Sequence, residues 1–245
     1  MNILAINDLS TLGKASLGVV LPILSTSENR VYPLPSCVLS SITSGFGEYT
    51  MHELTEFMQL SLKHILREKV PIDWIYTGYL INPNQAEMIL QFIDDYRAIN
   101  SDVKLLVDPV LGDDGVLYSS MTEAHVLAMK SLVEVADITT PNYTEYKMLK
   151  EVGTKFGEGC VITSHPNEHG LNCDVVVKIS GGDRVFAMEY SGETISGTGD
   201  MFCAAVLNGI ARQCSGEAGA AGYDLCDAVE QAIIYIKEHI LELCQ

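Results

Sequence analysis

Residues 195–207 read ISGTGDMFCAAVL, in which two glycines and an acid lead into an apolar, Ala-rich run. The run predicts a helix over Met201–Arg212, and Gly197 and Gly199 at its mouth let the backbone approach a ligand without obstruction by a Cβ atom. The free amides of the first turn and the positive end of the helix dipole then form an anion site. Asp200 lies in that turn, so the segment predicts a carboxylate beside an anion site.

Such a carboxylate can accept a proton from a hydroxyl group while the amides stabilise charge on a phosphoryl group. The same residues are equally compatible with an ordinary helix start, in which Gly, Thr and Asp serve as turn and cap. Because short glycine motifs also occur by chance, the motif needs support from the rest of the chain.

Short apolar segments alternate with longer segments of helical periodicity along the chain. The predicted strands are Ile3–Ile6, Trp74–Thr77, Leu105–Val107, Ile138–Thr139 and Cys160–Thr163. Near-continuous apolar strands separated by helices indicate a parallel sheet that is covered on both faces. Such sheets bind ligands outside the carboxyl ends of their strands, and Asp8, Asp108 and the pair Thr163-Ser164 stand at three of these ends.

A different pattern occupies residues 173–190. Apolar residues precede Gly181-Gly182-Asp183 and alternating apolar residues follow it, which is typical of a β-hairpin that turns at Gly-Gly. By its position this hairpin is a candidate flap. A last helix, from Leu225 to about Leu243, carries one apolar stripe and is expected to close the core.

Composition excludes some classes of partner. The chain has 245 residues, with 15 Lys and Arg against 32 Asp and Glu, and a formal net charge of −17. Nucleic acids and anionic membranes are not expected as partners, because binding to both depends on clustered Lys and Arg. No stretch reaches the ~18 uncharged apolar residues of a membrane span. We expect a single cytoplasmic domain over residues 1–245.

Seven cysteines, without a CxxC pair, are expected to be reduced thiols of a cytosolic protein. Cys160, His165, His169 and Cys173 could be drawn as a zinc site. Their spacing matches no common zinc finger, so we favour ordinary thiols.

Further blocks accompany the Gly-Thr-Gly-Asp segment in a fixed order. They are Asn7-Asp8-Leu9-Ser10 with Gly13, PSCVLSSIT at residues 35–43, Thr77-Gly78-Tyr79-Leu80, DPVLGD at residues 108–113 with Gly115 and Tyr118, TPNYTE at residues 140–145 and Val161-Ile162-Thr163-Ser164. The series resembles the ribokinase-like superfamily and, within it, the pyridoxal kinase family. The resemblance implies a three-layer ribokinase-like α/β fold: a central, mostly parallel sheet with helices on both faces and a small β-hairpin flap.

The resemblance also assigns roles to the matching positions. It implies a catalytic base at Asp200 and an anion hole made by Gly197, Thr198 and Gly199. It implies contacts to ATP and its metal at Asp108, Asp113, Asn142, Glu145, Thr163, Ser164 and Thr198. Within that set, Glu145 and Asp108 are the expected contacts of Mg²⁺, which keeps several waters and takes few carboxylates. The plain alternative for Asn142 and Glu145 is a capped helix start.

The acceptor side is implied in the same way. Around a pyridine ring the resemblance implies Asp8, Cys37, Leu39, Thr43, Tyr79 and Asp200, although ordinary packing is the plain alternative for Tyr79. The implied activity is ATP-dependent phosphorylation of the 5'-hydroxymethyl group of pyridoxal, pyridoxamine or pyridoxine, a reaction of vitamin B6 salvage. A homodimer is implied as well, and a requirement for a monovalent cation is left open.

Three positions depart from the common pyridoxal kinase pattern. Asp8 stands where many members carry Ser, Ser41 where Asn is expected, and Ile42 where His is usual. An Asp near the first strand also resembles the hydroxymethylpyrimidine kinases of thiamine biosynthesis, so that activity is the alternative. Against it, Gly112-Asp113 and Tyr118 follow the pyridoxal kinase form of the middle motif.

The rival from another class is a non-catalytic sensor of pyridoxal phosphate or nucleotide. Folds do host unrelated functions. A sensor has no need for a base beside an anion hole, however, so the intact Asp200, Asn142 and Glu145 favour an enzyme.

Overall fold

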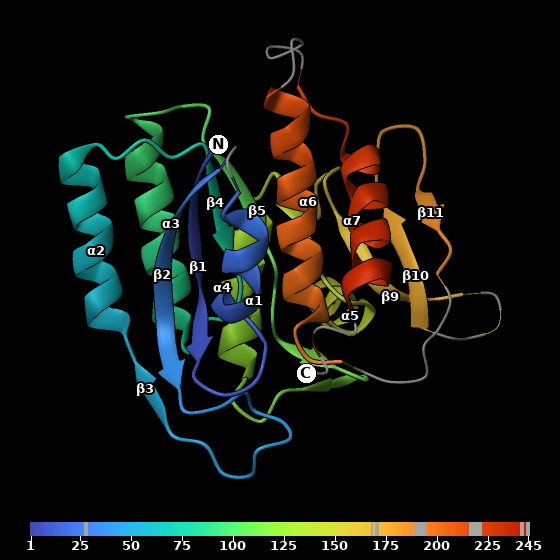
Figure 1. Ribbon diagram of the computed structural model, residues 1–245, viewed down its shortest axis with the longest axis horizontal. Coiled ribbons are helices and arrows are strands. Elements are labelled where there is room, and N and C mark those ends of the chain that lie inside the picture. Colours follow the sequence, from blue (N-terminus) through green and yellow to red (C-terminus); the bar gives the residue numbers. More distant parts are fainter. Residues whose placement is uncertain are drawn as a thin grey trace.

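The computed structural model describes residues 1–26, 29–167, 169, 172–188, 195–215, 222–240 and 243. Its centre is a six-stranded sheet with the order β3-β2-β1-β4-β5-β8 (Figure 1). The strands are β1 (Asn2–Ser10), β2 (Arg30–Leu39), β3 (Met51–Glu53), β4 (Trp74–Thr77), β5 (Lys104–Val107) and β8 (Ile138–Thr139). Every neighbouring pair is parallel except β2 and β3.

Two isolated parallel bridges extend this sheet beyond β8. They join Thr139 to Cys160 and Asn142 to Thr163, and so lead to β9 (Val161–Pro166). Strands β10 (Asn172–Val177) and β11 (Arg184–Phe186) follow as antiparallel neighbours. The predicted strands are therefore confirmed, and so is the mostly parallel sheet.

Helices cover both faces of the sheet (Figure 1). On one face lie α1 (Leu17–Leu24), α6 (Thr198–Ser215) and α7 (Leu225–His239), and on the other lie α2 (Thr55–Glu68), α3 (Pro83–Arg97), α4 (Glu123–Val133) and α5 (Tyr143–Glu151). Successive residues of a strand point to opposite faces. Accordingly, Ile3 belongs to the first core and Leu4 to the second. This three-layer arrangement confirms the expected α/β fold.

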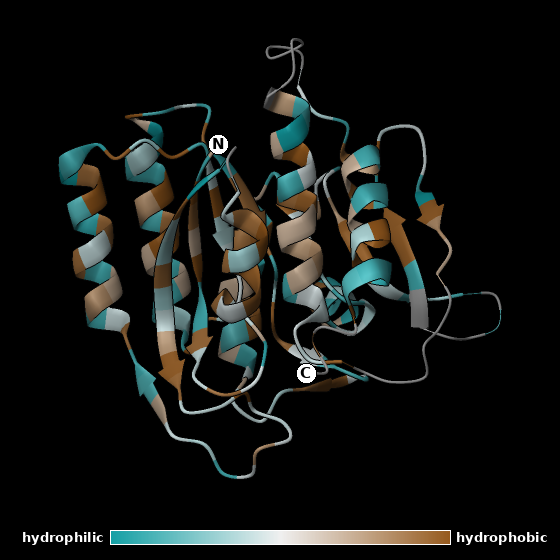
Figure 2. Cartoon of the chain, in the orientation of Figure 1, coloured by the Kyte–Doolittle hydropathy of each residue, from teal (hydrophilic) through white to brown (hydrophobic). Residues whose placement is uncertain are grey.

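Hydrophobic residues concentrate in the strands, whereas the helices carry both kinds (Figure 2). Helix α2 shows how one side of a helix is buried and the other exposed. Met58 and Leu62, four residues apart, are buried against the sheet. The neighbouring Phe57 has an exposed fraction of 53%, because a residue next to Met58 is turned about 100° away around the helix axis.

The carboxyl ends of the parallel strands lie at the lower edge in Figure 1, and the amino end of α6 lies at the same edge. A small hairpin made by β6 (Gly112–Asp113) and β7 (Val116–Leu117) is found there as well. Its turn residues, Asp114 and Gly115, both have positive φ. The amide of Gly115 donates to the hydroxyl of Thr144 at 2.9 Å, which anchors the hairpin on α5.

The hairpin that we predicted at Gly181-Gly182 forms between β10 and β11, and both glycines have positive φ. Its expected position as a flap is wrong. Strand β10 runs antiparallel to β9, so the β10–β11 turn lies at the edge opposite to the carboxyl ends of the parallel strands. The hairpin at the edge with the predicted acids is β6–β7.

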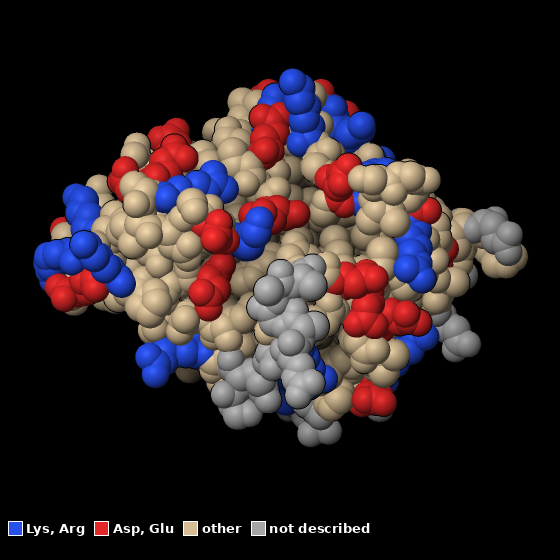
Figure 3. All heavy atoms as spheres, turned by 90° about the horizontal axis from the view of Figure 1, so that it is seen from above, with Lys and Arg blue, Asp and Glu red and all other residues tan. Residues whose placement is uncertain are grey.

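No helix within the described residues is long and apolar enough to cross a membrane. On the face seen in Figure 3, Lys and Arg are interleaved with Asp and Glu.

Candidate active site

Three predicted acids meet at the carboxyl edge of the sheet. Asp8 lies near the end of β1, Asp108 directly follows β5, and Asp200 lies in the first turn of α6. Burial raises the pKa of Asp8 to about 6, although the Ser16 hydroxyl lowers it, and the charge of Asp200 raises it further. Burial and then the charge of Asp200 also raise the pKa of Asp108. Ser16 donates to both Asp8 and Asp200, and Asp108 Oδ2 approaches Gly199, the residue before Asp200, so the three groups share one site.

Asp200 is held by hydrogen-bond donors on both carboxylate oxygens. Its Oδ1 accepts from Asn7 Nδ2 at 2.8 Å and from the Tyr76 hydroxyl at 3.4 Å. Its Oδ2 accepts from the backbone amide of Ser16 at 2.7 Å. Burial raises the pKa of Asp200, whereas the Ser16 amide and the Asn7 amide group lower it. The structure thus places Asp200 at the strand-end edge that its expected role requires.

The segment before Asp200 has the backbone of an anion site. Gly197 has a φ of +84°, and a Cβ atom there would lie 2.7 Å from the carbonyl oxygen of Lys14, so only glycine fits. The hydroxyl of Thr198 donates to the carbonyl of Ile195 at 2.7 Å. The amide of Thr198 donates to the carbonyl of Ile195 at 3.4 Å, and the amide of Met201 donates to that of Gly197 at 2.9 Å. The amides of Gly199 and Asp200 stand between these two donors and belong to the open first turn of the helix.

Asn142 and Glu145 form a reciprocal capping box at the start of α5. Asn142 Oδ1 accepts from the Glu145 amide at 2.9 Å, and Glu145 Oε2 accepts from the Asn142 amide at 2.9 Å. The plain alternative for this pair is therefore present. Glu145 does more than cap, because its Oε1 also accepts from the amides of Leu111 at 2.9 Å and Gly112 at 3.5 Å. Glu145 thereby holds the segment after Asp108 against α5.

The acids of this site fit a divalent cation as a shared counter-ion. Burial and then the charge of Asp108 raise the pKa of Glu145, as the charge of Asp200 does for Asp108. Neighbouring buried carboxyls that repel one another are the setting in which Mg²⁺, held by one or two carboxylates together with phosphate oxygens, offsets the charge. Within the described residues, no group of three or more His, Cys, Asp or Glu side chains is arranged to hold a metal by itself.

The acceptor side brings together Asp8, Cys37 and Tyr79. Burial and then the charge of Asp8 raise the pKa of Cys37 to about 12. Burial raises the pKa of Tyr79, and the charges of Cys37 and Asp8 add to the rise. The hydroxyl of Tyr79 donates to Ser120 Oγ at 3.2 Å. The backbone amides of Asp8 and Tyr79 both donate to Asn7 Oδ1, and the hydroxyl of Ser36, next to Cys37, donates to the carbonyl of Tyr79 at 2.7 Å. The predicted ring-binding residues Asp8, Cys37 and Tyr79 are therefore neighbours.

Two other predicted acceptor residues are Leu39 and Thr43. Leu39 is buried at the end of β2, where its carbonyl accepts from Thr11 at 2.9 Å. Thr43 is exposed in the loop of residues 40–50. In that loop the hydroxyls of Ser44 and Ser196 are 3.0 Å apart, so the acceptor loop touches the segment that precedes the anion site.

The predicted nucleotide-side residues border the same edge. The amide of Thr163 donates to the carbonyl of Pro141 at 2.9 Å, next to Asn142, and Ser164 has a φ of +51°. Asp113 is half-buried in β6, where burial raises its pKa. The pKa of Tyr118 is raised by burial and by the charges of Glu145, Asp113, Asp108 and Asp200, in that order. Tyr118 directly follows β7, and its amide donates at 3.0 Å to the carbonyl of Leu111, whose own amide donates to Glu145. Tyr118 therefore lies near the acid cluster formed by Asp8, Asp108, Glu145 and Asp200.

Sequence reasoning missed three residues that hold the acids. Asn7 and Tyr76 contact Asp200 as described above. Ser16 has a φ of +53°, which lets its amide donate to Asp200 while its hydroxyl donates to Asp8 Oδ1. Asn7 belongs to the Asn7-Asp8-Leu9-Ser10 motif, and its position next to Asp8 was the only sequence feature that pointed to a role at the site. Nothing in the sequence places Ser16 or Tyr76 at the site, because neither is adjacent to a motif acid.

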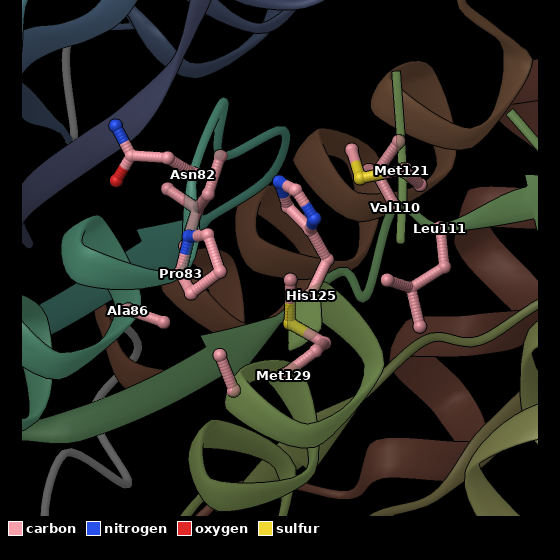
Figure 4. Close-up of a pocket in the computed structure, with 10 residues that line it drawn as sticks. Asn82, Pro83, Ala86, Val110, Leu111, Met121, His125 and Met129 are labelled. Carbon is pink, nitrogen blue, oxygen red and sulfur yellow. The ribbon is translucent and has the colours of Figure 1, made fainter. Parts of the chain in front are cut away.

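A small pocket lies behind this edge, between α3, the start of α4 and the segment after Asp108 (Figure 4). Its lining residues are Leu80, Asn82, Pro83, Ala86, Val110, Leu111, Met121, His125, Ala128 and Met129. None of them is a predicted site residue. His125 points its Nε2 at the carbonyl oxygen of Ile81, 3.0 Å away, so it joins α4 to the segment after β4. We therefore assign the site from the acids and not from this pocket.

The family becomes clear when the chain is compared with known proteins. The profile of the phosphomethylpyrimidine kinase family matches residues 27–245. This chain belongs to that family. Among curated proteins, a pyridoxal kinase of Arabidopsis thaliana is 35% identical over 75 residues, which are 31% of this chain and 24% of the relative. The matched segment thus spans about a quarter of that relative's length.

Solved structures match almost the whole chain of this family member. A Bacteroides thetaiotaomicron protein, described as a candidate phosphomethylpyrimidine kinase, is 31% identical with a TM-score of 0.85, covering 98% of this chain and 86% of that one. A second crystal form of it, with pyridoxal, has a TM-score of 0.79 at 30% identity and covers 98% and 87%. The pyridoxal kinase of Lactobacillus plantarum is 25% identical with a TM-score of 0.83 and covers 98% and 88%. The expected resemblance to pyridoxal kinases with a ribokinase-like fold is confirmed.

Proposed function

We propose that this family member is an ATP-dependent kinase that phosphorylates the 5'-hydroxymethyl group of a vitamin B6 vitamer. One observation carries the proposal: the buried carboxylate of Asp200, held by donors from Asn7 and Ser16, lies at the open first turn of α6. The same edge of the sheet carries a group that suits an aromatic acceptor, namely Asp8, Cys37 and Tyr79. The expected homodimer stays a prediction.

The residues of the chain divide the work of the transfer. Asp200 accepts the proton of the acceptor hydroxyl, and it does so late, because the transition state of phosphoryl transfer is loose. The first-turn amides after Gly197 stabilise the charge on the migrating phosphoryl group. Most of the acceleration then comes from positioning and from fixed dipoles in a buried site.

Asp108 and Glu145 are the residues that would support the metal. Mg²⁺ offsets negative charge on the phosphate oxygens when it is bound. Both oxygens of Glu145 already accept from backbone amides. Glu145 therefore acts mainly by fixing the segment after Asp108, while the Asp108 carboxylate, which accepts from the Thr140 hydroxyl at 3.4 Å, faces the helix mouth at Gly199.

Two chemistries compete as the acceptor of the phosphoryl group. The pyridoxal in one crystal form of the Bacteroides thetaiotaomicron protein supports a B6 vitamer. The family profile supports a hydroxymethylpyrimidine, and the buried Asp8 suits an aminopyrimidine as well as a protonated pyridine nitrogen. We favour the vitamer, because Gly112-Asp113 and Tyr118 follow the pyridoxal kinase form.

A panel of acceptors tests this function. We expect ADP release with ATP, Mg²⁺ and pyridoxal, pyridoxamine or pyridoxine, at a kcat/KM at least ~10-fold above that with hydroxymethylpyrimidine, the range in which pocket contacts separate similar substrates. The measurement is coupled ADP release, with phosphorylated product identified by mass. A preference for the pyrimidine would make thiamine biosynthesis the function. Release with none of the four, together with tight binding of pyridoxal phosphate, would favour the sensor.

Asp8→Asn separates substrate binding from stability. The raised pKa of Asp8, about 6, means that the folded state holds the proton more tightly than the unfolded state. Stability is therefore fully present below the unfolded pKa and is lost as the pH rises through about 6. The Asn variant carries no such charge, so we expect it to gain free energy of unfolding relative to wild type near neutral pH. This gain should be larger than the gain at about pH 4.5 by on the order of 2 kcal/mol.

The same variant should lose at least ~10-fold in kcat/KM for the preferred vitamer, because the charge-assisted hydrogen bond between Asp8 and a protonated pyridine nitrogen is removed. Chemical denaturation at both pH values and steady-state kinetics check the two effects. Asp73→Asn is the matched control, since Asp73 accepts from Asn2 beside the other end of β1. Equal effects of both substitutions on kcat/KM would contradict a substrate role for Asp8.

A further inference from the structure

Asn7 makes four hydrogen bonds from a fully buried side chain. Its exposed fraction is 0%. Its Oδ1 accepts from the backbone amides of Asp8 at 2.9 Å and Tyr79 at 2.8 Å. Its Nδ2 donates to Asp200 Oδ1 at 2.8 Å and to the Tyr76 hydroxyl at 3.3 Å. One amide group thus touches the candidate base and the backbone of two acceptor-side residues.

The chemistry of the four partners fixes the orientation of this amide. The backbone amides of Asp8 and Tyr79 can only donate, so the atom that faces them must be the carbonyl oxygen. The NH₂ group must then face Asp200, whose oxygen has to accept. Asn7 therefore favours the ionised form of Asp200, the form that can take a proton from an acceptor hydroxyl.

The surrounding backbone makes room for the Asn7 side chain. Pairing between β1 and β4 ends at Ile6 and Thr77, and the register of β1 with β2 shifts between Asn7 and Leu9. At Gly78 a Cβ atom would lie 2.4 Å from Asn7 Nδ2, so any larger residue would displace the amide. The chain is thus built around Asn7 at the point where β1 reaches the site.

We propose that Asn7 is a positioning residue for phosphoryl transfer. Its NH₂ group orients the Asp200 carboxylate, and its carbonyl oxygen, bound to the amides of Asp8 and Tyr79, fixes the distance between that carboxylate and the acceptor side. This inference rests on the proposed kinase function and assigns to Asn7 no contact with substrate. Burial raises the pKa of Asp200, and a protonated Asp200 cannot act as a base. The hydrogen bond that Asn7 donates to Asp200 therefore affects the rate, because it favours the ionised carboxylate.

The isosteric substitution Asn7→Asp tests the inference. It keeps the oxygen that accepts from the two backbone amides, and it replaces the donor to Asp200 with a second carboxylate oxygen. Two carboxyls at this distance share a proton, so the pKa of the pair rises. We expect the acid limb of the pH profile of kcat/KM to move up by about one unit or more, and kcat near neutral pH to fall at least ~10-fold. KM for ATP should stay within about threefold, because no nucleotide contact is changed.

Asn100→Asp is the matched control. Asn100 also accepts from a backbone amide, that of Asp102 at 3.0 Å, and donates to a backbone carbonyl, that of Ile72 at 3.0 Å. It lies after α3 and outside the acid cluster. The same chemical change there should alter stability alone and leave the acid limb of the profile in place.

The double variant N7D/D200N reports the contact without any substrate. It exchanges the donor and the acceptor between the two positions, so the hydrogen bond can form again in the opposite direction. We expect Tm of N7D to fall below that of wild type as the pH rises through neutrality, and the double variant to regain most of that loss while it stays catalytically inactive. Additive losses in Tm would overturn the pairing of Asn7 with Asp200.

Activity distinguishes the remaining outcomes. A folded N7D with the acid limb and kcat of an active wild type would overturn the positioning role alone. A wild type that phosphorylates no acceptor would overturn the proposed function, and the positioning role with it.

Discussion

Asp200→Asn is expected to lower kcat by more than ~100-fold while nucleotide binding is retained, which is the scale typical of a lost general base. The amide is isosteric with the carboxylate and still accepts a hydrogen bond, but it cannot take a proton from the acceptor hydroxyl. The first-turn amides of α6 remain, so the site for the phosphoryl group is expected to survive. Steady-state kinetics and ADP titration measure the two effects separately.

Asp227→Asn provides the control for this prediction. Asp227 is likewise an acid in the first turn of a helix, α7, and contacts Gln213 at 3.0 Å outside the acid cluster. A general effect of charge at a helix start would appear in both variants. Near-normal turnover of Asp200→Asn would remove Asp200 from the mechanism.

Glu145→Ala is the substitution with the largest expected effect on stability. Glu145 has an exposed fraction of 4% and accepts from the amides of Asn142, Leu111 and Gly112. Each buried amide left without a partner costs about 1–3 kcal/mol, so we expect a loss of about 3 kcal/mol or more in the free energy of unfolding. Denaturation in urea, with an unchanged m-value, measures it.

Glu145→Gln and Glu123→Ala sharpen this prediction. Gln keeps one accepting oxygen and removes the repulsion from Asp108 that raises the pKa of Glu145, so its stability should lie between those of wild type and Glu145→Ala. Turnover of the Gln variant should need more Mg²⁺, because a supporting carboxylate is gone. Glu123 is an exposed acid in the first turn of α4. An equal loss of stability in Glu123→Ala would show that the partners of Glu145 are irrelevant.

Sequence patterns predicted most of the sheet but not its second strand. β2 contains Pro33 and Pro35, which cannot donate to a ladder and therefore argue against a strand in the middle of a sheet. β3 pairs with β2 only from Cys37 onward, so both prolines lie in the part of β2 that has a single neighbour, β1. Helix α1 was missed for a related reason, because Pro22 lies inside it.

The sequence motifs identified only some residues of the candidate site. Asp8, Asp108 and Asp200 were found because each stands beside a strand end or a helix start in the sequence. Ser16 and Tyr76 were not found, since a hydroxyl in a loop or in a buried strand has no pattern of its own. Their role depends on a partner at Asp200 that is more than a hundred residues away.

By itself the sequence determined the class of fold, the edge of the sheet at which the acids collect and the backbone freedom at Gly197, because periodicity and glycine placement act over a few neighbouring residues. Only the tertiary structure decided that Asn7 joins the base to the acceptor side, and that the β10–β11 turn lies away from the site. Those outcomes depend on the direction in which distant strands pair and on which side chains the folded chain buries together. No local pattern encodes that information.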